Sequence, residues 1–152
     1  MKKFLLILLF PLTLFSQKEM TTTTYLEVNF GVAFVEMLDG FPFPGCSGLI
    51  GTTINIEGFL IDVQGGFAIP TIITGKVGLG FSIPSDNGDI NIVAGMRPYP
   101  FHLYTQSTLK NTEKGCWIIS VELGSNVFSP GFDHWESLGM INFGWRYTIN
   151  TY

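Results

Sequence analysis

Bulky apolar residues alternate with small or polar residues over long stretches of this chain. From Leu26 to Phe34 every second residue is bulky and apolar, and the residues between them are small or polar. From Ile141 to Ile149 the same alternation returns near the C-terminus. Successive side chains of a β-strand point to opposite faces, so both segments predict strands with one apolar and one polar surface.

The alternation continues between these two segments and predicts eight strands. The predicted strands are Thr24–Met37, Gly48–Ile56, Phe59–Ile69, Ile72–Ile83, Ile90–Arg97, Phe101–Leu109, Cys116–Gly124 and Leu138–Asn150. Glu57–Gly58, Asn87–Gly88 and the polar segment Lys110–Gly115 predict short turns. If residues 90–106 formed one strand, seven would remain, whereas bacterial membrane barrels of this kind normally have an even number. An even number also places the longer loops Leu38–Ser47 and Ser125–Ser137 at one end.

The two faces differ in a way that favours a barrel with its apolar side outward. The polar face has three acids and three bases, among many glycine, serine and asparagine residues: Glu27, Asp62, Lys76, Arg97, Glu122 and Arg146. Small residues suit the crowded bore of an eight-stranded barrel, and balanced charges suit a low-dielectric interior. We therefore expect an all-β fold, a single antiparallel up-and-down transmembrane β-barrel with these six residues as an interior charge network. A soluble lipocalin-like barrel, with the bulky face inside, is the alternative.

The N-terminal segment predicts export. Lys2 and Lys3 precede the apolar run Phe4–Phe15, which is too short to cross a bilayer as a helix. We expect residues 1–17 to be a cleaved signal peptide and residues 18–152 to be the barrel domain, with the bacterial outer membrane as the location. An uncleaved anchor is the alternative, because Leu14 departs from the small residues usual at a cleavage site.

Charge and composition give few signs of ligand or cofactor chemistry. The chain has 12 acidic and 8 basic residues, and no basic cluster that would predict binding to nucleic acid. Two cysteines and two histidines lack the close spacing of a metal site, so we expect no metal and no cofactor. Cys46 and Cys116 are predicted at opposite ends of an eight-stranded barrel, too far apart for a disulfide. In a seven-stranded barrel they would lie at the same end.

Catalytic residue types are present but do not form a recognisable set. His102, His134, Asp133 and Ser107 are types that a barrel hydrolase or acyltransferase would use. His102 is predicted to face inward, where it would form hydrogen bonds in the bore. Because no set of nucleophile, base and orienting group can be assembled from the sequence, we expect no enzymatic activity.

Several aromatic residues are predicted near strand ends, where amphipathic rings favour a membrane interface. They are Tyr25, Phe34, Tyr99, Trp117, Trp135, Trp145 and Tyr147. With this pattern, residues 25–152 resemble the small eight-stranded outer-membrane barrels of bacteria, the class that includes outer membrane protein X and the lipid A palmitoyltransferase. Such barrels commonly end in a strand that closes on a terminal aromatic. Phe143, Trp145 and Tyr147 fit that description, whereas Tyr152 is out of phase with them.

The resemblance implies a small integral outer-membrane protein with a structural, accessory or adhesion role. Its expected partners are outer-membrane lipid and another envelope protein bound through the outer loops. The predicted loop contacts are Phe41, Phe43, Asp133, His134 and Trp135. Phenylalanines that rest on the barrel rim or dip into lipid are an equal alternative to the partner contact. A narrow porin-like channel and a secreted lipid-binding barrel are the alternative functions.

Overall fold

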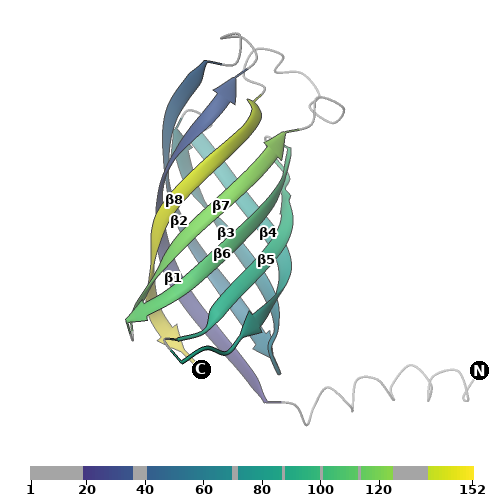
Figure 1. Cartoon of the computed structure of the whole chain (residues 1–152), viewed down its shortest axis with the longest axis vertical. Helices are drawn as coiled ribbons and strands as arrows, with labels where there is room; N and C mark the ends of the chain where they lie inside the picture. Colours follow the sequence, from purple (N-terminus) through teal and green to yellow (C-terminus); the bar gives the residue numbers. More distant parts are fainter. Residues whose placement is uncertain are drawn as a thin grey trace, which may run out of the picture.

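The chain folds into a closed barrel of eight antiparallel strands (Figure 1). The computed structural model describes residues 19–35, 41–69, 72–86, 88–99, 101–112, 114–124 and 137–152. Each strand pairs with the next one along the chain, and β1 pairs with β8 to close the barrel. The strands are β1 (Met20–Val35), β2 (Pro42–Ile56), β3 (Phe59–Ile69), β4 (Ile72–Ile83), β5 (Ile90–Arg97), β6 (His102–Thr112), β7 (Gly115–Gly124) and β8 (Ser137–Thr151). The predicted all-β, eight-stranded, up-and-down topology is confirmed.

The bounds of three strands, β3, β4 and β5, agree with the prediction. The predicted polar turn Lys110–Gly115 is shorter than expected, because β6 extends to Thr112 and β7 begins at Gly115. In the part of the chain that the structure describes, no helix has the length and apolar character needed to cross a membrane. The predicted signal peptide, residues 1–17, lies outside the described residues.

The predicted loop Leu38–Ser47 is wrong over much of its length, because β2 already begins at Pro42. Its first residues pair with β1, from Phe34↔Pro42 to Phe30↔Cys46. On the other side the ladder to β3 starts only at Cys46↔Ile69. Pro42 and Pro44 therefore lie where β2 has a neighbour on one side among the described residues, and there the missing N–H of proline is tolerated.

The two ends of the barrel differ in their connections. At the end that we call the lower end, Glu57 and Gly58 form a two-residue turn with φ angles of 52° and 91°. Positive φ at both central residues is the signature of the hairpin turn whose twist matches that of the strands. Residue Tyr152 also lies at the lower end, where its backbone exchanges two hydrogen bonds with Thr22. At the opposite, upper end, β3 ends at Ile69 and β5 ends at Arg97.

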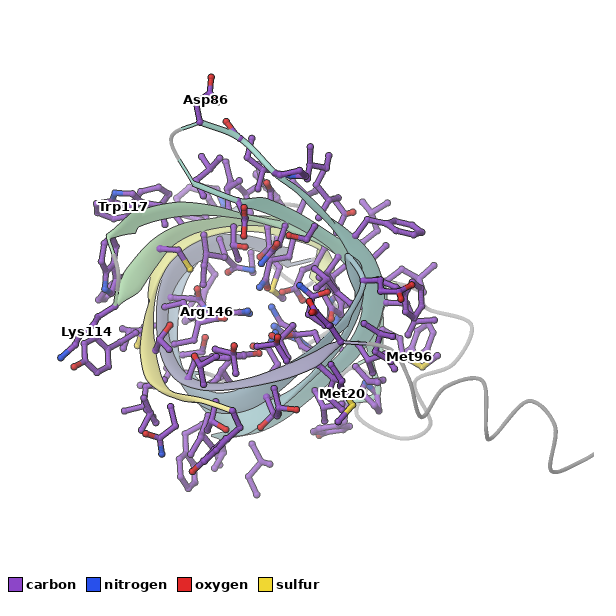
Figure 2. The ribbon with its side chains drawn as sticks, turned by 90° about the horizontal axis from the view of Figure 1, so that it is seen from below. Met20, Asp86, Met96, Lys114, Trp117 and Arg146 are labelled. Atoms are coloured by element: carbon purple, nitrogen blue, oxygen red, sulfur yellow. The ribbon has the colours of Figure 1, made fainter. Side chains whose placement is uncertain are left out.

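The apolar face of the sheet points away from the barrel axis and the charged face points inward (Figure 2). On β3, Phe67 is 72% exposed, whereas the inward side chain of Asp62 is 0% exposed. Trp117 and Met96 project outward and Arg146 projects into the centre. The face assignment from the sequence alternation is confirmed, and a lipocalin-like arrangement with the bulky face inside is contradicted.

A minority of apolar and aromatic side chains share the interior with the charges. Leu60, Val93 and Tyr104 form a buried cluster inside the barrel. Tyr25 is also fully buried, so its predicted position at a membrane interface is wrong. Because β1 begins at Met20, Tyr25 lies further inside the barrel than the predicted start at Thr24 implied, on the same face as Glu27.

Candidate functional site

The buried charged residues of the bore form two separate groups, and the first lies nearer the lower end. We call Glu27, Asp62 and Arg146 the lower trio. The guanidinium of Arg146 donates from Nε and from its terminal nitrogen to Glu27 Oε2, at 3.0 and 2.8 Å. A second terminal nitrogen of Arg146 lies 3.4 Å from Asp62 Oδ1. Arg146 therefore binds two carboxylates that come from β1 and β3.

Neutral side chains complete the coordination of Asp62. The hydroxyl of Tyr25 donates to both carboxylate oxygens, at 2.9 and 3.0 Å. Thr53 also donates its hydroxyl to Asp62, and Gln64 donates its amide at 3.2 Å. The guanidinium carbon of Arg146 lies 3.6 Å from the centre of the Tyr25 ring, which adds a cation–π contact. The buried carboxylate of Asp62 is tolerated because hydrogen bonds use nearly all its capacity to accept.

The second group lies nearer the upper end. We call Lys76, Arg97 and Glu122 the upper trio. Lys76 Nζ is 2.7 Å from Glu122 Oε1, and a terminal nitrogen of Arg97 is 3.0 Å from each carboxylate oxygen of Glu122. Asn142 donates its amide to the same carboxylate at 3.0 Å. Lys76 also lies 5.2 Å from the centre of the Tyr104 ring.

The two trios have opposite formal charges. The lower trio joins two carboxylates to one guanidinium, which gives −1. The upper trio joins two cations to one carboxylate, which gives +1. The six charges that the sequence placed on one face are thus all buried and cancel as a whole, while each trio keeps one unit in excess. Arg146 and Glu122 are the central members, because each contacts both other members of its trio.

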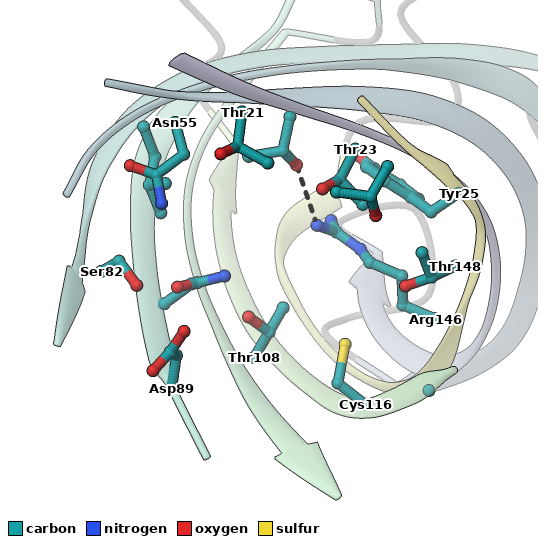
Figure 3. Close-up of a pocket in the computed structure, with 15 residues that line it drawn as sticks. Thr21, Thr23, Tyr25, Asn55, Ser82, Asp89, Thr108, Cys116, Arg146 and Thr148 are labelled. Atoms are coloured by element: carbon teal, nitrogen blue, oxygen red, sulfur yellow. Dashed lines mark hydrogen bonds between the residues drawn. The ribbon is translucent and has the colours of Figure 1, made fainter. Parts of the chain in front are cut away.

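Two cavities flank the trios inside the barrel. The lower cavity, of about 350 Å³, is lined by Tyr25 and Arg146 and by several hydroxyl side chains, among them Thr21, Thr23 and Thr148 (Figure 3). The upper cavity, of about 50 Å³, is lined in part by Arg97 and Asn142. Most of the bore between them is filled by side chains, as expected for an eight-stranded barrel.

Of the five predicted loop contacts, Phe41 and Phe43 belong to the described residues. Phe41 is exposed and directly precedes β2, whereas Phe43 lies within β2, half-buried and paired with Ala33. Phe43 is therefore a strand residue at the rim of the barrel rather than a loop residue. The predicted contacts Asp133, His134 and Trp135 lie outside the described residues.

Of the residues considered for catalysis, His102 and Ser107 lie five positions apart on β6, and Asp133 and His134 lie outside the described residues. His102 is buried in the bore, as predicted, next to the upper end of β5 through its pairing with Arg97. Ser107, further along β6, pairs with Ile92 and Ile119. No three His, Cys, Asp or Glu side chains gather as metal ligands in the described ranges. The reasoning from sequence missed Tyr25, although its odd-numbered position beside Glu27 and Asn29 already indicated an inward side chain.

Comparison with known proteins identifies a fold but no family. No family model matches the chain, and no curated protein matches it. One solved structure, described as "De novo design of transmembrane beta-barrels", is 14% identical with a TM-score of 0.53, over 84% of this chain and 95% of the other. A solution NMR structure of the de novo designed TMB2.3 is 13% identical with a TM-score of 0.50, over 84% and 96% of the two chains. The chain is similar to these barrels in fold.

Proposed function

We propose that this protein is a small integral barrel of the bacterial outer membrane, with a bore filled by side chains and a structural, accessory or adhesion role. The observation that supports the proposal is the inverted distribution of polarity. Large apolar side chains such as Phe30, Phe67 and Leu123 are exposed over the outer wall, while six charged residues are buried inside. In water this arrangement would expose apolar surface, whereas in a bilayer it places each face in its favoured surroundings.

The positions of the aromatic residues support the same proposal. Trp117 stacks on Phe143 at 4.9 Å and meets Trp145 edge-on at 4.7 Å, on the outer wall toward the lower end. Phe59 and Phe81 form another outward pair near that end. At the upper end, Tyr99 is exposed. Aromatic residues at both ends of an apolar wall are typical of membrane barrels, whose aromatic girdles lie at the two interfaces.

Membrane fractionation tests this proposal directly. We expect the protein to stay in the membrane pellet after carbonate washing and to need detergent for extraction. We also expect the unheated protein to migrate differently from the heated protein on a gel, because a closed barrel resists detergent unfolding. A protein released without detergent, with a bound apolar ligand, would contradict the membrane assignment and favour a secreted carrier.

A narrow channel is the second candidate, because cavities lie at both ends of the bore. Between them, the side chains of Arg146, Tyr25 and Asp62 fill the passage through direct mutual contacts. We therefore expect purified protein in planar bilayers to show no sustained conductance. Stable unitary currents from the wild-type protein would favour the channel.

The structural or adhesion role includes a partner contact at the upper end. Phe41 is 68% exposed beside the start of β2, and Pro42 and Pro44 follow it. Stiffening by proline reduces the entropy that is lost when a segment binds. Cross-linking in intact cells through Phe41→Cys tests this contact, with Met20→Cys at the lower end as a matched control, both in a chain in which the free cysteines Cys46 and Cys116 are replaced by serine. A partner captured by both variants equally would contradict a specific site.

A further inference from the structure

The upper cavity borders the upper trio through one of its cations. Of the described residues that surround this space of about 50 Å³, Arg97 alone carries a charge, while Ser47 and Asn142 add polar groups. Apolar residues and glycines, among them Ala33 and Met140, form most of the remaining wall. Because no carboxylate of the described residues lines the cavity, the ionic group next to it is a guanidinium.

The guanidinium of Arg97 has one donor without a partner. The residue is only 5% exposed, and one of its terminal nitrogens binds the carboxylate of Glu122 at 3.0 Å. Its Nε is buried and has no hydrogen-bond partner among the described residues. A buried donor without a partner is costly, and more so when it belongs to a charged group. A hydrogen-bond acceptor in the upper cavity would remove that cost.

Ser47 provides a second donor in the same lining. Its hydroxyl oxygen accepts a hydrogen bond from the amide of Asn29 at 3.3 Å. A hydroxyl has a proton to donate in addition to the lone pairs that accept, so Ser47 can donate to a group in the cavity. Asn142 adds no third donor, because its amide nitrogen already donates to Ser120 and Glu122.

The net charge of the upper trio favours a negative occupant over water. Lys76 and Arg97 share the carboxylate of Glu122, which leaves one positive charge in excess. The compensating negative charge belongs to the lower trio, which lies nearer the other end of the bore. An uncompensated charge in a low-dielectric interior is costly, and a close opposite charge offsets that cost. A monovalent anion would bring the formal charge of the trio to zero, whereas water would leave the excess unchanged.

We propose that the upper cavity binds one small monovalent inorganic anion of the chloride type, held by Arg97 Nε and the hydroxyl of Ser47. A water-sized occupant needs about 10–15 Å³ of such space, so the cavity has room for the ion. The anion then completes the upper trio as a structural component. This inference goes beyond the proposed function, because the trio and the cavity belong to the interior of the barrel and not to its outer wall.

The dependence of stability on chloride tests the proposal with the full chain folded in mild detergent. Urea unfolding is measured while chloride is replaced by gluconate, a much larger anion, at constant sodium concentration. A ligand that binds only the folded state multiplies the ratio of folded to unfolded protein by one plus its concentration divided by Kd. We expect that ratio to rise about tenfold when chloride reaches about ten times Kd, and its logarithm to follow the logarithm of the chloride concentration with a slope approaching one.

Four variants locate the site. Arg97→Lys keeps a cation beside Glu122 but lacks the Nε donor, and Lys76→Met keeps Nε but removes the excess charge. Each should weaken chloride binding by about tenfold or more, as expected for a lost interaction with a charged group. Ser47→Ala removes only the second donor and should weaken binding by a smaller factor. Ser82→Ala is the matched control, because Ser82 lines the lower cavity, and it should leave the chloride dependence unchanged.

Crystals of the wild-type barrel grown in bromide test the position directly, because bromide replaces chloride and scatters anomalously. We expect an anomalous peak in the upper cavity, within hydrogen-bonding distance of Arg97 Nε. A water molecule at that place would overturn the proposal, and so would equal stability of the wild type in chloride and gluconate. A chloride response that Arg97→Lys and Lys76→Met both retain in full would identify a general salt effect and also overturn it. None of these outcomes depends on the fractionation, which tests the membrane location alone.

Discussion

The two trios predict that their central residues matter more for stability than their outer ones. Arg146→Met removes the only cation of the lower trio and leaves the carboxylates of Glu27 and Asp62 buried together. Glu122→Gln does the reverse, because it leaves the cations Lys76 and Arg97 without their shared carboxylate. Breaking a buried ion pair in this way costs about 3–5 kcal/mol. We expect each central substitution to lower the free energy of unfolding by that amount.

The outer substitutions are the matched comparison. Glu27→Gln leaves Arg146 paired with Asp62, and Lys76→Met leaves Arg97 paired with Glu122, so each trio keeps one neutral ion pair. The loss is then a hydrogen bond to a charged group, about 1.5–3 kcal/mol. Reversible urea unfolding of the barrel in lipid vesicles measures all four values. If the outer substitutions cost as much as the central ones, the distinction between central and outer members is wrong. If Arg146→Met costs less than about 1 kcal/mol, the bore is hydrated enough to screen its charges and the reasoning fails.

Three further outcomes are expected. Val121→Arg, on the outer wall, should lower the free energy of unfolding in lipid vesicles by about 2–4 kcal/mol if the residue lies near the middle of the bilayer. Ser120→Arg, its inward neighbour, should instead disrupt packing in detergent and lipid alike. Equal tolerance of both substitutions would contradict the assigned faces. Gly58→Ala should cost about 1 kcal/mol because Gly58 has a φ of 91°, and unchanged urea unfolding would contradict that strain. Cys46 and Cys116 lie at opposite ends of the barrel, so reductant should leave the intact mass unchanged, and a gain of two hydrogens would contradict the strand order.

The sequence predicted the strands well where the alternation of apolar and polar or small residues runs uninterrupted to the end of the strand. The alternation predicts the bounds of β3, β4 and β5. A shift of one residue in these strands would place the apolar side chains inside the barrel and the polar ones outside. The prediction failed at Pro42–Ser47, where proline and glycine indicated a loop. There β1 alone holds the first part of β2, and a one-sided ladder tolerates residues that a two-sided ladder rejects. Local composition does not report how many neighbours a strand has.

The sequence predicts which charged residues line the bore but not which of them contact one another. Alternation alone placed all six charged residues on the inner face, including Lys76 and Arg97. It could not divide them into trios, because each contact joins strands that are far apart in the chain, such as Arg146 with Glu27. It also missed the role of Tyr25, whose aromatic ring was assigned to the interface by its nearness to a predicted strand end. Its hydroxyl bonds to Asp62 depend on strand pairing that the alternation does not contain.

This dependence on pairing gives the lower trio a part in specifying how the barrel closes. In the observed register between β1 and β8, Glu27 is opposite Arg146. A slip of two residues keeps every apolar side chain on the outer wall, so the hydrophobic pattern cannot reject it. The slip would, however, place Glu27 opposite Gly144 or Thr148 and leave a buried carboxylate without its guanidinium. Leaving that carboxylate unpaired costs several kcal/mol, which is comparable to the whole free energy of unfolding of a marginally stable barrel. The ion pair therefore selects one register between β1 and β8 among those that the alternation permits.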